Sequence, residues 1–311
     1  MTMHTRCAAA ALATMAMLTG CAGAGGARGA PVPASGFSIV DARSGATLAP
    51  DALVDSARAA GLVVFGEFHD DAGAHRAQRA LLEALARRDV PVVLSLEMFE
   101  RDVQPALDAW LAGTLADSAF LATARPWGNY ATDYRPLVEL AKARRWPVVA
   151  ANVPRPLASA VSRQGLGVLD TIARGVRATA ARELVCPTDD AYHARFVQVM
   201  SGGAPGGHGG ASAPTAMVER FYLAQCLKDE TMAESVVAAM ERAPAGTVVV
   251  HLTGAFHSDS SLGTVSRIVR RRPQATPRVL TTVRIATAAQ ARTLPDSVRS
   301  LAHWLVLVPG R

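Results

Sequence analysis

The chain has 311 residues, of which 50% are hydrophobic and 19% charged, and this composition is typical of a globular protein rather than a disordered or collagen-like one. After the first 20 residues no apolar run approaches the about 18 residues that a membrane-spanning helix needs, which excludes a polytopic membrane protein. The net charge is +6, and only Lys142 and Lys228 among the 32 basic residues are lysine. Such an arginine bias is typical of genome composition, so nucleic-acid binding is not favoured.

Residues 1–20 have the pattern of an export signal, with Arg6 as the lone charge before a short apolar run. The run ends in Leu-Thr-Gly-Cys, which resembles the lipobox of bacterial lipoproteins and predicts lipidation of Cys21. Residues 21–36 are rich in Ala, Gly and Pro and are expected to form a flexible tether. With Ala22 after the cysteine, we expect a lipid anchor in the outer membrane, facing the periplasm. An Ala-rich leader with a chance cysteine is the alternative.

Four cysteines are present, and two of them fall in the N-terminal region. The other two, Cys186 and Cys226, would then lie in an oxidising compartment, where a pair tends to form a disulfide. Two buried free thiols are the alternative. Neither cysteine has the closely spaced Cys or His residues that a metal site needs.

Residues 37–311 are predicted to form one α/β domain, beginning with a small hairpin near residues 37–48. Buried strands are expected at 62–65, 90–96, 147–151, 247–252, 278–285 and 303–308. Helices are expected between them, at 51–60, 74–88, 103–124, 135–145 and 262–272. Because strands alternate with helices, we predict a mostly parallel sheet with helices on both faces.

Residues 155–240 are predicted to be an inserted helical subdomain. Its helices are expected at 156–164, 168–184, 188–200 and 216–240. Between the last two lies a Gly-rich segment, 201–214, which is typical of a mobile loop. Its His208 is expected to be an exposed histidine without partners rather than a ligand.

Polar side chains follow four of the predicted strands at their carboxyl ends. In an open parallel sheet the ligand crevice lies outside these ends, so the side chains are expected to converge there. They are Glu67, His69, Glu97, Asn152 and His257. Gly-x-x-His occurs at two of the four strand ends, each time with Phe before the His. The alternative is that these groups only satisfy backbone hydrogen bonds, although Glu97 follows an apolar strand and needs a partner.

A second unusual segment, residues 125–136, contains two of the four tyrosines of the chain and one of the four tryptophans. Its Pro and Gly residues predict a loop that carries aromatic and cationic groups: Arg125, Trp127, Tyr130, Tyr134 and Arg135. This mixture suits a flat, acidic ligand such as a porphyrin with propionates. A hydrophobic plug that anchors the next helix is the alternative.

Six segments, taken in order, resemble the ChaN-like haem-binding lipoproteins of the Tiki superfamily: GEFHD, SLEMFERDVQ, RPWGNYATDYRP, PVVAANVPR, FYLAQCLKDETMA and HLTGAFHSD. The resemblance extends from about residue 37 to the end of the chain. It implies an α/β fold with an added helical subdomain and a role in haem-iron acquisition with an outer-membrane haem receptor or uptake machinery. It also implies dimers that hold haem pairs, with tyrosine on the iron and histidine near the propionates. The Gly-rich segment 201–214 departs from the family pattern.

The first functional hypothesis is therefore a haem-binding lipoprotein. Fe(III) stabilises a tyrosinate ligand, so Tyr130 or Tyr134 is the expected iron ligand. Four further side chains are available for the propionates: His69, His257, Arg125 and Arg135.

The second hypothesis is a hydrolase. In this case His69 or His257 is a general base on water, and Glu67 or Glu97 orients the water or acts as an acid. A divalent metal such as Zn, Mn or Co is an optional part of this hypothesis. The sequence has no Gly-x-Ser-x-Gly elbow and no P-loop, so a serine esterase or an NTPase has no support.

Overall fold

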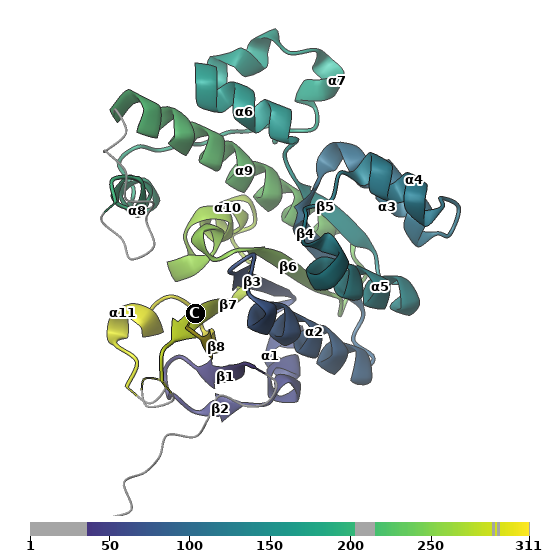
Figure 1. Cartoon of the computed structure of the whole chain (residues 1–311), viewed down its shortest axis with the longest axis vertical. Coiled ribbons are helices and arrows are strands. Elements are labelled where there is room, and N and C mark those ends of the chain that lie inside the picture. The colour runs from purple at the N-terminus through teal and green to yellow at the C-terminus, as the bar shows by residue number, and fades with distance from the viewer. Residues whose placement is uncertain (1–35, 203–214, 288–289, 291–292, 311) are drawn as a thin grey trace, which may run out of the picture.

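The computed structural model describes residues 36–202, 215–287, 290 and 293–310 (Figure 1). The predicted export signal, Cys21, nearly all of the tether, and His208 lie outside the described residues. Within the described ranges, no helix is long and apolar enough to cross a membrane.

The centre of the fold is an eight-stranded sheet in the order β2-β1-β8-β7-β3-β6-β4-β5. The six strands from β8 to β5 are parallel to one another, and β1 pairs antiparallel with both β8 and β2. The predicted mostly parallel α/β fold is therefore confirmed. The strands are β1 (Ser38–Asp41), β2 (Thr47–Leu48), β3 (Leu62–Glu67), β4 (Val92–Glu100), β5 (Val148–Asn152), β6 (Val248–Gly254), β7 (Arg278–Ile285) and β8 (Trp304–Pro309).

Helices cover both faces of the sheet because its central strands are apolar on both sides. In β3, Val63 and Phe65 face a core shared with α1 (Val54–Ala60), α2 (Ala72–Arg87), α3 (Gln104–Leu111), α4 (Asp117–Ala124) and α5 (Arg135–Arg144). On the other face, Leu62 and Val64 pack with α9 (Thr215–Arg242) and α10 (Gly263–Arg271) (Figure 1). The remaining helices are α6 (Arg155–Gln164), α7 (Arg174–Arg177), α8 (Ala191–Met200) and α11 (Asp296–Arg299).

Two predicted helices differ from the structure. Residues 103–124 form α3 and α4 rather than one helix, because Gly113 adopts a left-handed conformation with φ of 76° between them. Residues 168–184 contain only the end of a 3-10 turn, Leu166–Thr171, and the single turn of α7. Gly175 and several β-branched residues lower the helix propensity of this segment, which explains the difference.

The register of β3 and β6 brings the two Gly-x-x-His units side by side. Gly66 pairs with Thr253, and Glu67 pairs with Gly254, at the carboxyl ends of both strands. The chain then turns directly into α2 after β3, where the Asp71 carboxylate accepts hydrogen bonds from the first backbone N–H groups of the helix. Both units therefore emerge at the same edge of the sheet.

Replacing Gly66 with alanine is expected to lower the free energy of unfolding by about 1–3 kcal/mol, because the added methyl group has no room. A Cβ at this position would lie 2.4 Å from the Ser258 Oγ and 2.9 Å from the backbone Cα of Ala255. Urea unfolding measures the change. The control is Gly128→Ala, where a Cβ would meet nothing within 4 Å. Equal losses for the two variants would contradict this explanation.

Candidate functional site

Glu67, at the end of β3, is the centre of the first half of the site. Its carboxylate is buried and accepts hydrogen bonds from the Tyr134 hydroxyl at 2.5 Å, from the Gln78 amide and from His69 Nδ1, which lies 2.8 Å from Oε1. Burial alone would lower the pKa of His69, but the hydrogen bond to Glu67 and the negative charges of Glu97 and Glu67 raise it. Glu67 therefore fixes the orientation of the His69 ring.

The backbone of His69 is also held in place. Its carbonyl oxygen accepts a hydrogen bond from Asn129 Nδ2 at 2.7 Å and lies 3.1 Å from His75 Nε2. Asn129 in turn bonds to Asp133 at 2.8 Å. The His69 ring packs edge-on against Trp127, with 4.8 Å between the ring centroids. His75, Asn129 and Asp133 are not among the site residues predicted from the sequence.

Glu97 and His257 form the second half of the site. Glu97 Oε2 accepts hydrogen bonds from the Thr253 hydroxyl and the Gly254 N–H, both at 2.7 Å, and Oε1 lies 3.5 Å from His257 Nε2. On its other side, His257 Nδ1 lies 2.7 Å from Oδ1 of the buried Asp229, on α9. The buried imidazole therefore sits between two carboxylates.

The charges of this half are strongly coupled. Burial would raise the pKa of Glu97, but the charges of His257 and His69 and the Gly254 N–H lower it to about 2. Burial would lower the pKa of His257, but the charges of Glu97 and Asp229 raise it. The positive charge of Lys228 on α9 acts against this increase. The carboxylates therefore favour the protonated forms of the two imidazoles, and the imidazoles favour the ionised form of Glu97.

Gly254 is the point at which the two halves meet. A Cβ on this residue would lie 2.9 Å from His69 Nε2 and 3.7 Å from His257 Cδ2, so a larger side chain here would displace the rings. The structure thus brings Glu67, His69, Glu97 and His257 together at the carboxyl edge, as the topology predicts. Asn152 lies farther along this edge, on β5, where its side chain accepts a hydrogen bond from Val153 N.

The segment predicted to be an aromatic loop contains a π-helical turn, Tyr130–Tyr134, that runs directly into α5. Tyr130 packs against Phe99 and Phe120, and Tyr134 bonds to Glu67, so both rings are buried. Burial raises the pKa of Tyr130 to about 12 and that of Tyr134 well above its usual range. In this conformation neither predicted iron ligand is presented to a molecule from solvent.

The two arginines of this segment, Arg125 and Arg135, lie at the surface. Arg135 pairs with Asp117 and Glu139, whereas Arg125 bonds to Glu100 and Asp102 at 2.8 Å. Arg125 also lines a pocket of about 330 Å³ with four other residues, Glu100, Arg155, Pro156 and Ser159. Because Glu100 ends β4 and Arg155 begins α6 just after β5, this pocket belongs to the same edge of the sheet as the histidines.

The divalent metal that the hydrolase hypothesis allows has no support from the arrangement of the described His, Cys, Asp and Glu side chains. Within the part of the chain that the structure describes, no group of three or more His, Cys, Asp or Glu residues is arranged to hold a metal ion.

The stability of the protein is expected to fall as the pH decreases from 4.5 towards 2, because Glu97 must take up a proton. Folding lowers the pKa of this carboxyl group from 4.5 to about 2, so its ionised form stabilises the folded state by about 3 kcal/mol at a pH above 4.5. This contribution is lost as the pH falls through these two values. Urea unfolding of the wild type and of Glu97→Gln at several pH values measures this contribution. The difference between them should shrink between pH 5 and pH 3, and a constant difference would contradict the assignment.

The fold and the paired histidines and carboxylates define an α/β protein with a polar candidate site at the carboxyl edge of a parallel sheet. Residues 53–268 match the family described as "Haem-binding uptake, Tiki superfamily, ChaN". This match covers more than half of the chain, so the protein belongs to that family, as its sequence motifs indicate.

Solved structures are similar in fold. ChaN of Campylobacter jejuni, described as binding haem cofacially, has a TM-score of 0.63 at 15% identity, and the match covers 88% of this chain and 97% of that chain. Weaker matches are the toxin effector domain RRSP of Vibrio vulnificus (TM-score 0.42, 17% identity, 77% and 36% covered) and the erythromycin esterase EreC (0.44, 12%, 76% and 73%). At 15% identity, the likeness to ChaN of Campylobacter jejuni shows the fold alone. None of the curated proteins matches the sequence.

Proposed function

We propose that this protein binds haem at the carboxyl edge of the sheet and acts in haem-iron acquisition. The observation that carries the proposal is that His69 is exposed to solvent on one side and held by a buried carboxylate on the other. Its side chain is 42% exposed, while its Nδ1 is held by the buried Glu67. A histidine that ligates a metal usually donates its other ring N–H to a carboxylate or carbonyl, which fixes the ring and makes it a better ligand. His69 has this arrangement.

The chain's own residues fit a histidine-bound haem better than a tyrosine-bound one. All four tyrosines are buried, and three of them donate their hydroxyls to Glu67, Asp229 and the Pro187 carbonyl. Tyrosine ligation by Tyr130 or Tyr134 would require the segment after Arg125 to open. We therefore favour His69 as the group that meets the iron, with Trp127 against the porphyrin ring.

The propionates need cationic partners near this edge. Arg125 and Arg155 line the pocket over the ends of β4 and β5, and the Arg155 side chain is 71% exposed, with its nearest carboxylate, Glu100, 3.9 Å away. Arg155 is therefore the better propionate partner, because Arg125 already bonds to two carboxylates. Arg135, which pairs with Asp117 and Glu139, is less suited to the role.

Titration of the purified protein with haemin tests the proposal. We expect an intense Soret band that rises linearly and stops rising at a fixed ratio of haem to protein. A gradual change without saturation, equal to that of an unrelated protein of the same charge, would contradict haem binding.

The cellular role rests on the sequence pattern of the N-terminus. We propose that lipidated Cys21 anchors the protein to the outer membrane, where it faces the periplasm, exchanges haem with a receptor or uptake machinery, and forms a homodimer around haem. The protein should partition into the detergent phase, and Cys21→Ser should abolish this. Unchanged partitioning of the variant would contradict the anchor.

The second candidate function, a hydrolase, is favoured by one observation. His257 is held by Asp229 beside Glu97, and His69 is held by Glu67, so two oriented imidazoles face the same glycine. Such pairs are suited to general acid–base catalysis on water. Ester and amide hydrolysis that Glu97→Gln and His257→Asn both abolish, in protein without haem affinity, would support this function in place of the first.

A further inference from the structure

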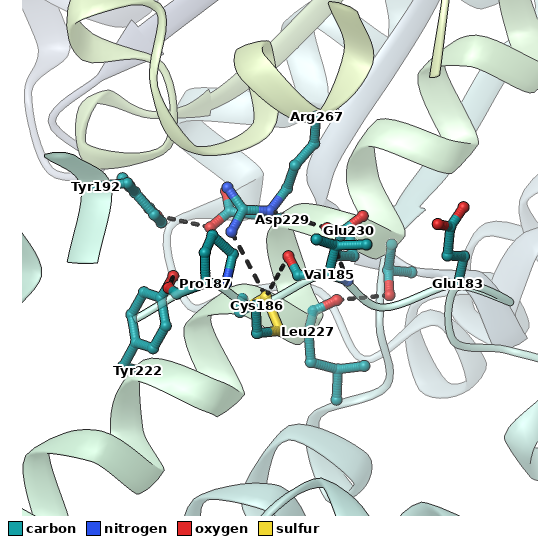
Figure 2. The surroundings of a disulfide bond; sticks show 12 residues. Glu183, Val185, Cys186, Pro187, Tyr192, Tyr222, Leu227, Asp229, Glu230 and Arg267 are labelled. Atoms are coloured by element: carbon teal, nitrogen blue, oxygen red, sulfur yellow. Dashed lines mark hydrogen bonds and ion pairs between the residues drawn. A yellow bond between two sulfur atoms is a disulfide. The ribbon is translucent and has the colours of Figure 1, made fainter. Parts of the chain in front are cut away.

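The disulfide between Cys186 and Cys226 lies directly beside the residues that hold His257. Cys226 is on α9, one helical turn before Asp229, and Cys186 is in the segment that leads into α8. Figure 2 shows the bridge below the Arg267 side chain, with Asp229 beside Arg267 and the Tyr192 hydroxyl pointing towards Asp229. The bridge thus fastens the segment that leads into α8 to the helix that supplies Asp229.

Tyr192, on the first turn of α8, is the connection from this segment to the site. Its hydroxyl donates to Asp229 Oδ2 at 2.6 Å, while Asp229 Oδ1 accepts from the Thr264 hydroxyl and from His257 Nδ1, both at 2.7 Å. The position of the Asp229 carboxylate, and with it that of the His257 ring, therefore depends on Tyr192.

Arg267 joins the bridge to Tyr192. One nitrogen of its guanidinium lies 3.5 Å from Cys226 Sγ, and the centre of the group lies 5.1 Å from the Tyr192 ring centroid. Asp229 and Arg267 are both buried, so the line from the disulfide through Arg267 and Tyr192 to Asp229 runs inside the protein (Figure 2).

The segment before α8 has weaker ties to α9 besides the disulfide. The Pro187 carbonyl accepts a hydrogen bond from the Tyr222 hydroxyl at 2.5 Å, and Val185 N donates to Glu230 at 3.2 Å. Hydrogen bonds of this kind break and re-form, whereas the covalent bridge does not.

We propose that the Cys186–Cys226 disulfide is a positioning device for His257, which holds Tyr192 on Asp229 and Asp229 on the imidazole, so that the site is complete only in the oxidised protein. Its consequence is that the site takes its final geometry only in a compartment where disulfides form. In the test below, dithiothreitol supplies two electrons and two protons; the S–S bond breaks, two thiols form and the reagent becomes a cyclic disulfide.

Proton NMR of the full chain tests the proposal through the His257 Nδ1–H, whose hydrogen bond to a buried carboxylate gives a downfield resonance. The variant His257→Asn identifies this signal by removing it. We expect the resonance in the oxidised protein and its loss after reduction, with two thiols counted and the far-UV circular dichroism retained. Where the reagent fails to open the bridge, the double variant Cys186→Ser, Cys226→Ser replaces it.

Two tyrosine variants separate positioning from general destabilisation, with the disulfide intact in both. Tyr192→Phe removes the donor to Asp229 and should shift the resonance. Tyr222→Phe removes a buried hydroxyl of the same aromatic cluster, but this hydroxyl bonds to the Pro187 carbonyl, so the resonance should not change. The proposal is overturned by a resonance that survives reduction unshifted, by its absence from the oxidised protein, or by loss of the circular dichroism on reduction, because the bridge would then hold the whole fold.

Discussion

Replacing Glu230 with glutamine is expected to lower the free energy of unfolding by about 3–5 kcal/mol, the usual cost of removing one partner of a buried ion pair. The Glu230 carboxylate is fully buried on α9 and pairs with Arg267 at 3.3 Å, with Arg270 at 2.7 Å and with Arg271. Without its charge, three guanidinium groups of α10 would face one another across a site with no anion between them.

An exposed ion pair provides the matched control. Arg79 and Glu83 are one turn apart on α2, 2.7 Å from each other, and both side chains are exposed. Glu83→Gln should therefore change the stability by less than about 1 kcal/mol. Chemical unfolding at neutral pH measures both variants, and a Glu230→Gln loss no larger than that of the control would show that the arginines find other partners.

Opening the Cys186–Cys226 disulfide is expected to lower the free energy of unfolding by about 4 kcal/mol in the chain-entropy estimate for a loop of this length. The two cysteines are 40 residues apart, and the sequence between them contains the Gly-rich segment. Once the bridge is open, these residues gain conformational entropy in the unfolded chain. Urea unfolding with and without reductant gives the difference. Equal stabilities, or two thiols counted in the unreduced, unfolded protein, would contradict this prediction.

The position of the candidate site follows from the sequence because the argument for it is topological. Apolar runs identify the parallel strands, and parallel strands end at one edge, so Glu67, His69, Glu97 and His257 had to emerge at the same edge. Their close approach depends also on the strand order, which the sequence does not give. The strands β3, β6 and β4 are neighbours, whereas Asn152 lies on the edge strand β5, beyond β4.

The partners of these residues could not be predicted in the same way. Asp229 and Tyr192 come from helices of the inserted segment, and no local pattern relates them to His257. One indication was available: Asp229 and Glu230 stand together in the middle of a helix that also buries Leu227 and Met232, and a buried acidic pair needs cationic or hydrogen-bonding partners.

The aromatic segment was predicted to be a loop because of its Pro and Gly residues. Tyr130 and Tyr134 are four residues apart, however, and Val138 continues the same spacing into α5. This is the pattern of one buried helical face. Read in this way, the sequence favours the hydrophobic plug for the two tyrosines, and Trp127 is the aromatic residue that remains beside His69.

The absorption spectrum of the ferric haem complex, recorded for His69→Ala and Tyr130→Phe, tests the central claim most directly. We predict that His69→Ala loses the wild-type Soret and charge-transfer bands. Tyr130→Phe should keep them, because its hydroxyl is buried and finds no hydrogen-bond partner among the described residues. Wild-type bands in His69→Ala together with shifted bands in Tyr130→Phe would contradict the account and make tyrosine the iron ligand.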